Sequence, residues 1–140
     1  MSFNVLIVDD SDVMRKVIRR VVNLSGLDLG DIFEASNGQE ALEAMEDQWV
    51  DIVLSDINMP VMNGIDLLQR MQEDETMAGT PVIMVTTEGR SERIDEILGL
   101  GARGYITKPF KPEDIRNVIS QALGVNLDGD NVEEPEDSDF

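Results

Sequence analysis

The stretch Val5-Leu6-Ile7-Val8-Asp9-Asp10 decides the fold. It begins with an unbroken apolar run, mostly β-branched, and ends abruptly at two acids. A short continuous apolar run of this kind is typical of a strand that is buried on both faces, as in a parallel sheet. Ser11 follows directly and is a good N-cap for a helix. The stretch therefore predicts a strand, a tight turn and a helix, with Asp9 and Asp10 at the carboxyl end of the strand.

The same strand-then-helix pattern recurs along the chain. Further apolar strand segments are predicted at 32–35, 52–54, 82–85 and 105–107, and each is followed by apolar residues at helical spacing. Pro112 falls in the first turn of the last helix, where its missing N–H is tolerated. Five alternating strand–helix units predict an α/β fold with a parallel sheet that is covered by helices on both faces.

Length and charge suggest how the chain is divided. The chain has 140 residues, of which 41% are hydrophobic, enough for the core of one domain. Residues 128–140 contain seven acidic side chains and no basic one. Because a dense charge of one sign opposes folding, we expect a folded domain over residues 1–125 and a disordered acidic tail over 126–140.

Composition excludes several classes of protein. Cysteine and histidine are absent, which removes disulfides, thiolate metal sites and the usual zinc ligands. A net charge of −18 should repel nucleic acid and anionic membranes. No apolar run approaches the ~20 residues of a membrane span, and the N-terminus does not have the pattern of a signal peptide. We therefore expect a cytoplasmic protein. We also expect a monomer.

Polar side chains follow the predicted strands at one edge of the sheet. Asp9 and Asp10 follow the first strand, Asp56 the third, Thr86 the fourth and Lys108 the fifth. Each alone has a simpler explanation, since an Asp-Asp pair is usually a turn or a helix cap. Because the carboxyl ends of parallel strands meet at one edge, where ligands bind in such folds, we expect the five groups to converge on one site.

The charges of this set predict a metal and a reaction. Two unit charges about 4 Å apart repel by about 4 kcal/mol at an effective dielectric constant of about 20, and Lys108 alone does not neutralise three carboxylates. Mg²⁺ suits such an oxygen site. A carboxylate such as Asp56 can attack phosphorus and form an acyl phosphate. The metal and Lys108 would then stabilise the phosphoryl oxygens, and Thr86 would donate a hydrogen bond to them.

Five motifs carry a family resemblance. They are Val-Asp-Asp at 8–10, Ser-Asp-Ile-Asn-Met-Pro at 55–60, Asn-Gly at 63–64, Val-Thr-Thr-Glu at 85–88 and Gly-Tyr-Ile-Thr-Lys-Pro-Phe at 104–110. With them, residues 4–123 resemble the response-regulator receiver family, and within it the chemotaxis branch. The resemblance implies the flavodoxin-like strand order 2-1-3-4-5 and phosphoryl transfer from a histidine kinase to Asp56.

The resemblance also implies roles for individual residues. Mg²⁺ would be held by Asp10, Asp56 and the backbone carbonyl of Asn58, with Asp9 acting through water. Thr86 and Tyr105 would form the switch, and the Lys108–Pro109 peptide bond would be cis. Asn58 and Glu88 flank the site as they do in the chemotaxis branch, whereas Thr87 stands where a smaller residue is common. These three residues are expected to modulate access to the phosphoryl group.

The resemblance implies partners as well. They are a CheA-like histidine kinase, an output protein such as a flagellar motor switch component, and a phosphatase. A protein of this kind catalyses only its own phosphorylation and dephosphorylation. Three alternatives stay open: a single-domain receiver of a phosphorelay outside chemotaxis, an aspartyl-phosphate hydrolase, and a flavodoxin-like FMN carrier. The hydrolases use an Asp-x-Asp pair, whose second position is Asn58 here, and the anionic 9–11 loop would repel the phosphate of FMN.

Overall fold

A computed structural model describes residues 2–87 and 89–124. It contains a five-stranded parallel sheet in the order β2-β1-β3-β4-β5, which confirms the predicted order. The strands are β1 (Phe3–Val8), β2 (Leu29–Ala35), β3 (Ile52–Asp56), β4 (Val82–Thr86) and β5 (Gly104–Thr107). The helices are α1 (Asp12–Asn23), α2 (Gly38–Asp47), α3 (Gly64–Glu73), α4 (Ser91–Gly99) and α5 (Pro112–Leu123). The tail predicted at 126–140 lies outside the described residues.

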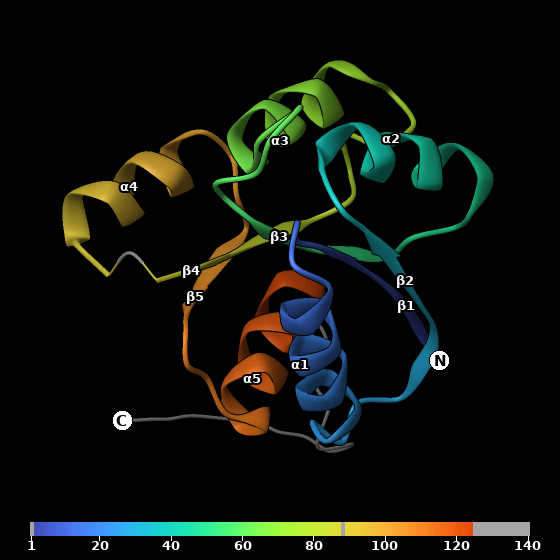
Figure 1. The fold of residues 1–140 in the computed structure, drawn as a ribbon, viewed down its shortest axis with the longest axis vertical. Helices are drawn as coiled ribbons and strands as arrows, with labels where there is room; N and C mark the ends of the chain where they lie inside the picture. Colours follow the sequence, from blue (N-terminus) through green and yellow to red (C-terminus); the bar gives the residue numbers. More distant parts are fainter. Residues whose placement is uncertain (1, 88, 125–140) are drawn as a thin grey trace.

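Helices cover both faces of the sheet. α1 and α5 pack on one face, and α2, α3 and α4 lie on the other (Figure 1). Alternate residues of β1 divide between the two cores: Val5 and Ile7 belong to the core beneath α1 and α5, whereas Leu6 and Val8 belong to the core beneath the other helices. All four are fully buried, which explains why the strand reads as a continuous apolar run. None of the helices within the described ranges is long and apolar enough to span a bilayer.

The strand β2 starts earlier than its apolar residues suggest. The prediction placed it at 32–35, but pairing with β1 begins at Leu29, opposite Phe3, and the register shifts before Val5. Asn4 stands at this irregularity, and its side-chain oxygen accepts the Asp31 backbone N–H at 2.8 Å. A side chain thus replaces a regular ladder bond, an arrangement that the apolar pattern of an edge strand does not reveal.

Predicted caps mark the starts of two helices. The Ser11 hydroxyl accepts the Met14 backbone N–H at 3.1 Å, and the Asn37 side chain accepts that of Glu40 at 2.9 Å. Asn37-Gly38 therefore begins α2 and does not form a hairpin turn. These caps satisfy N–H groups that have no partner within the helix, and Ser11 begins α1 directly after the two acids.

The loop between β3 and α3 contains an unfavourable backbone conformation. Val61 has a φ of 72°, and the residue is 83% exposed. A β-branched residue in this left-handed region brings its Cβ close to the backbone, at a cost of about 1–2 kcal/mol. Asn tolerates the same conformation better, because its short polar side chain can hydrogen-bond locally.

We therefore predict that Val61→Asn raises the free energy of unfolding by about 1 kcal/mol, measured by urea denaturation. Val13→Asn is the matched control, because Val13 is also exposed, at 72%, but lies in α1. That control should change stability by less than about 0.5 kcal/mol. If the two variants shift stability equally, the conformation of Val61 is not strained.

Candidate functional site

The carboxyl edge of the sheet brings three acids together. Asp9 and Asp10 follow β1, and Asp56 is the last residue of the neighbouring strand β3. Each of the three offers a carboxylate oxygen, and these oxygens all lie within 4.8 Å of one another. The convergence that the sequence predicts for the three carboxylates is therefore present in the structure.

Asp9 is the buried member of this acidic cluster. Its side chain is almost inaccessible, and its carboxylate accepts the Ser11 backbone N–H at 2.9 Å. Its other oxygen lies 3.4 Å from the Lys108 Nζ. This ion pair joins the first loop to the last, across the middle of the sheet.

A backbone hydrogen bond at the end of β5 brings Lys108 to the acids. Its backbone N–H donates to the Thr86 carbonyl at 2.7 Å, which fastens the end of β5 to the end of β4. The Lys108–Pro109 peptide bond is cis, as the resemblance implies. Among the described residues, Lys108 is the cation that forms an ion pair with the cluster.

Asp56 lies half-buried between these groups. Its Oδ1 accepts the Ile57 backbone N–H at 2.8 Å. Burial raises the pKa of Asp56 above its usual value, and the negative charges of Asp9 and Asp10 act in the same direction. Lys108 and the Ile57 N–H oppose the shift and lower the pKa, but they do not cancel it. The charged form of Asp56 is therefore held in surroundings that disfavour it.

The backbone beside Asp56 admits only a glycine at position 64. The Gly64 N–H donates to the Ile57 carbonyl at 2.7 Å, and a Cβ at this position would overlap the Asp56 carbonyl oxygen. Close approach of this kind is a common reason for a glycine. The Asn63-Gly64 motif thus has a physical role, in that it lets α3 begin directly against the end of β3.

Arg15 is a contributor that the sequence argument missed. Its guanidinium donates to the Asp9 carbonyl and forms ion pairs with Asp12 and with Glu34 of β2. It therefore holds the acidic loop against α1 and β2. No motif points to this role, because Glu34 comes from a separate strand and the contact depends on how α1 packs against the sheet.

The other predicted site residues lie around the cluster. Thr86 is buried at the end of β4, beside Thr107 of β5. Asn58 and Thr87 are exposed, and Tyr105 on β5 has 38% of its surface accessible. Glu88 lies outside the described residues. The structure thus puts Thr86 at the same sheet edge as the acids, with Tyr105 one strand over.

The donor set fits a hard divalent cation. Three carboxylates and one paired ammonium group leave an excess of negative charge among oxygen ligands. Mg²⁺ prefers oxygen ligands and is usually bound by one or two carboxylates together with water and phosphate. The acidic cluster is therefore compatible with Mg²⁺, both in its chemistry and in its charge.

Comparison with known families identifies this arrangement. The family model for the response regulator receiver domain matches residues 5–120. The chain belongs to the response regulator receiver family. It is a receiver domain of two-component signalling, and this membership favours a receiver over the hydrolase and the FMN carrier that the sequence left open.

Similar proteins include several chemotaxis receivers. The chain is 38% identical to the chemotaxis protein CheY1 of Helicobacter pylori over 122 residues, which cover 86% of this chain and 97% of that protein. Vibrio cholerae CheY4 has a similar structure, with a TM-score of 0.77 and 32% identity, over 88% of this chain and 100% of that chain. A CheX–CheY–BeF3–Mg²⁺ complex from Borrelia burgdorferi matches with a TM-score of 0.75 and 31% identity, over 84% of this chain and 87% of that chain.

The raised pKa of Asp56 leads to a stability prediction for this receiver. In metal-free buffer at pH 7, Asp56→Asn should raise the free energy of unfolding by on the order of 1 kcal/mol. The amide keeps an oxygen for the Ile57 N–H but removes a charge that the folded state disfavours. The gain should shrink as pH falls through the folded-state pKa of Asp56, because the wild-type side chain then also becomes neutral.

Urea unfolding in the presence of EDTA measures this difference. Asp95→Asn is the control, since Asp95 is an exposed residue of α4 and its loss changes the net charge equally. A loss of stability in Asp56→Asn, or an equal gain in both variants, would show that repulsion within the acidic cluster does not destabilise the fold.

Proposed function

We propose that this receiver accepts a phosphoryl group on Asp56 from a histidine kinase and so switches the binding of an output protein in chemotaxis. The observation that carries the proposal is the position of Asp56. It ends β3 as a half-buried carboxylate, with Asp9 and Asp10 within 4.8 Å and with Lys108 paired to Asp9. Nucleophilic carboxylates that form acyl phosphates need this combination of a fixed acid and nearby positive charge.

One hydrogen bond distinguishes the two side-chain oxygens of Asp56 and supports different roles for them. Oδ1 accepts the Ile57 N–H, so Oδ2 is the atom that attacks phosphorus. The Oδ2–P bond forms as the P–N bond of the phosphohistidine donor breaks, and the electron pair leaves with the imidazole nitrogen. Lys108 exchanges its contact with Asp9 for one with a phosphoryl oxygen, and the Thr86 hydroxyl donates to another. Such interactions stabilise charge where it develops during transfer.

We assign the metal site to Asp9, Asp10, Asp56 and the backbone carbonyl of Asn58. Mg²⁺ bound there supplies positive charge to the phosphoryl oxygens. The presence of Mg²⁺ in the Borrelia burgdorferi complex supports the assignment. Exposed Asn58 and Thr87 stand at the rim of the site and, together with Glu88, would govern how water reaches the acyl phosphate.

The relatives guide the assignment of partners. Chemotaxis proteins among the similar sequences support a CheA-like kinase as the donor and a flagellar motor switch component as the output protein. The CheX–CheY complex shows that a structural relative binds a further protein, so a CheX-like protein is a candidate partner of this receiver, beside the kinase, the output protein and a phosphatase. We place these events in the cytoplasm.

Phosphorylation should be confined to Asp56. We predict that incubation with acetyl phosphate and Mg²⁺ adds the mass of a single phosphoryl group, detected by mass spectrometry of the intact protein. Asp56→Asn should lose this gain, because the amide is not a nucleophile for phosphorus, and EDTA should suppress it in the wild type.

Asp95→Asn is again the control, since it removes an exposed acid on α4 and should be phosphorylated like the wild type. Full phosphorylation of Asp56→Asn would refute the acceptor assignment, and full phosphorylation in EDTA would refute the role of the metal.

We propose further that Thr86 and Tyr105 carry the signal to the face formed by α4, β5 and α5. Phosphorylation adds about −1.5 to −2 charge beside buried Thr86, whose hydroxyl would turn toward the new oxygens. Tyr105 lies one strand over, is exposed, and lines a hollow of about 460 Å³ against α5. It therefore has room to change position. Basic residues lie within these elements or directly beside them, namely Arg90, Arg93, Arg103, Lys111 and Arg116.

A partner needs only a small preference for one position of Tyr105. A difference of about 1.4 kcal/mol between the two states gives a tenfold change in affinity. Thr86→Ala should still accept a phosphoryl group at Asp56 but should transmit less of the change, because the hydroxyl that joins the phosphoryl group to β4 is missing.

Amide NMR shifts on phosphorylation measure the transmission. In Thr86→Ala, the shifts across residues 90–118 should fall to less than about half of those in the wild type. Thr80→Ala, before the start of β4, is the control and should keep them. Unchanged shifts in Thr86→Ala would show that the relay runs through other residues.

A further inference from the structure

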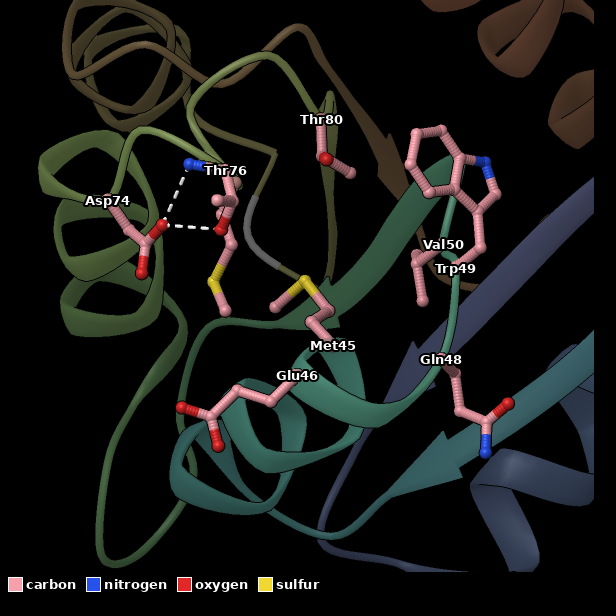
Figure 2. A pocket seen from close by; sticks show the side chains of 9 residues that line it. Met45, Glu46, Gln48, Trp49, Val50, Asp74, Thr76 and Thr80 are labelled. Atoms are coloured by element: carbon pink, nitrogen blue, oxygen red, sulfur yellow. Dashed lines mark hydrogen bonds between the residues drawn. The ribbon is translucent and has the colours of Figure 1, made fainter.

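A hollow of about 460 Å³ lies at the amino edge of the sheet, away from the acidic cluster. It is formed by the end of α2, the segment before β3 and the segment before β4. Figure 2 shows the Trp49 indole on one side, Asp74 and Thr76 on the other, and Met45 between them. These segments precede the amino ends of β3 and β4, whereas Asp56 is the carboxyl-terminal residue of β3. The hollow and the proposed phosphorylation site therefore lie at opposite edges of the sheet.

Trp49 is exposed but held in place. It is 76% accessible, an unusual state for so large an apolar ring. Its indole N–H donates to the Asp51 Oδ1 at 2.9 Å, while the Asp51 Oδ2 accepts the Asn4 backbone N–H at 2.8 Å. The Asn4 side chain in turn donates to the Trp49 carbonyl at 2.9 Å. Both the ring and the backbone of Trp49 are therefore fixed, so a ligand would meet a ring that is already oriented.

The remaining walls combine thioethers with acids. Met77 is buried and Met45 half-buried, and both line the hollow. Glu46 and Asp74 line it as well, and none of the described lining residues is basic. The Asp74 carboxylate is fixed by the backbone N–H and the hydroxyl of Thr76, at 2.8 and 2.6 Å. These hydrogen bonds lower the pKa of Asp74, so it stays charged at neutral pH.

This chemistry selects a cation with a flat charged group and an apolar stem. A guanidinium stacks on an indole face, adaptable methionine side chains suit the methylene stem of an arginine, and carboxylates pair with its charge. Nucleic acid, anionic lipid and a second copy of this chain, at a net charge of −18, would be repelled. The acidic segment 128–140 of this chain is excluded as an occupant for the same reason.

We propose that this hollow is a docking site for an arginine side chain on a basic segment of a partner protein. Exposed aromatic rings at fixed positions are frequent anchors of protein interfaces. Because the hollow lies at the opposite edge of the sheet from Asp56, and none of its described lining residues belongs to α4, β5 or α5, it would hold a partner in both phosphorylation states. The receiver would thus have a constant attachment point separate from its switched surface.

Trp49 provides the test, because it is the one tryptophan of the chain and its fluorescence reports on this site alone. The full chain is titrated with a blocked pentapeptide, Gly-Arg-Gly-Arg-Gly, and with its lysine counterpart at the same salt concentration. A saturable change in emission is expected, with the arginine peptide binding about two- to fivefold more tightly, as its planar group stacks on the ring. Equal binding of the two peptides, or no saturation, would overturn the proposal.

Matched variants distinguish binding in the hollow from attraction to the overall negative charge of the chain. Glu46→Gln should lower the affinity for the arginine peptide about two- to fivefold. Glu43→Gln, on the same helix but outside the lining, changes the net charge equally and should keep affinity within about twofold. Equal losses in the two variants would mean attraction to the acidic surface in general, which contradicts a specific site.

Trp49→Leu removes the ring and is followed by amide NMR at Val50 and Thr80. The affinity for the arginine peptide that this titration gives should fall at least severalfold. Urea unfolding reports whether the variant is folded. Undiminished binding in the folded variant would overturn the role of the ring. If the variant does not fold, Trp49→Phe replaces it and should bind more weakly than the wild type, since the indole is the strongest cation acceptor of the aromatic side chains.

Discussion

Repulsion among three carboxylates is the constraint on which this receiver is built. Asp9, Asp10 and Asp56 offer oxygens within 4.8 Å of one another, and the ammonium group of Lys108 pairs with the buried Asp9. A chain that was free to relax would separate these charges. They stay together because β1 and β3 are neighbours in the centre of the sheet, with side chains that are buried in two cores. Burial of apolar strands thus opposes electrostatic repulsion at their ends.

The same constraint explains the contacts around the acids. Backbone N–H groups of Ser11 and Ile57 donate to Asp9 and Asp56, and Lys108 is brought close by the bond between its own N–H and Thr86. These donors lower the cost of the negative charge without removing it, since the pKa of Asp56 remains raised. A site with uncompensated negative charge attracts a cation, and a bound cation would then stabilise the oxygens of a phosphoryl group. In this sense the raised pKa of Asp56 and the fit of the acidic cluster to a cation have one cause.

The sequence predicted the parts of this site that depend on strand ends. Alternating apolar runs are enough to place Asp9, Asp10, Asp56, Thr86 and Lys108 at the carboxyl edge, because parallel strands all point the same way. The start of β2 at Leu29 was missed, since it depends on the Asn4 side chain and not on an apolar pattern. Arg15 was missed for a related reason, because its contacts join segments that only the folded packing brings together.

The strand β3 links the two functional edges. Its carboxyl end carries Asp56. Before its amino end lie Trp49 and Asp51, and the Asp51 carboxylate orients the Trp49 indole at the proposed docking hollow. From Ile52 to Leu54 the strand is completely buried, and Val53 and Leu54 are paired with neighbouring strands on both sides. Such a close-packed strand resists small displacements, so a charge added at Asp56 should move the loops and β5 before it moves Trp49. A partner held at the amino edge would therefore stay bound while the α4–β5–α5 face changes, and the receiver could deliver its signal without first releasing the protein that holds it.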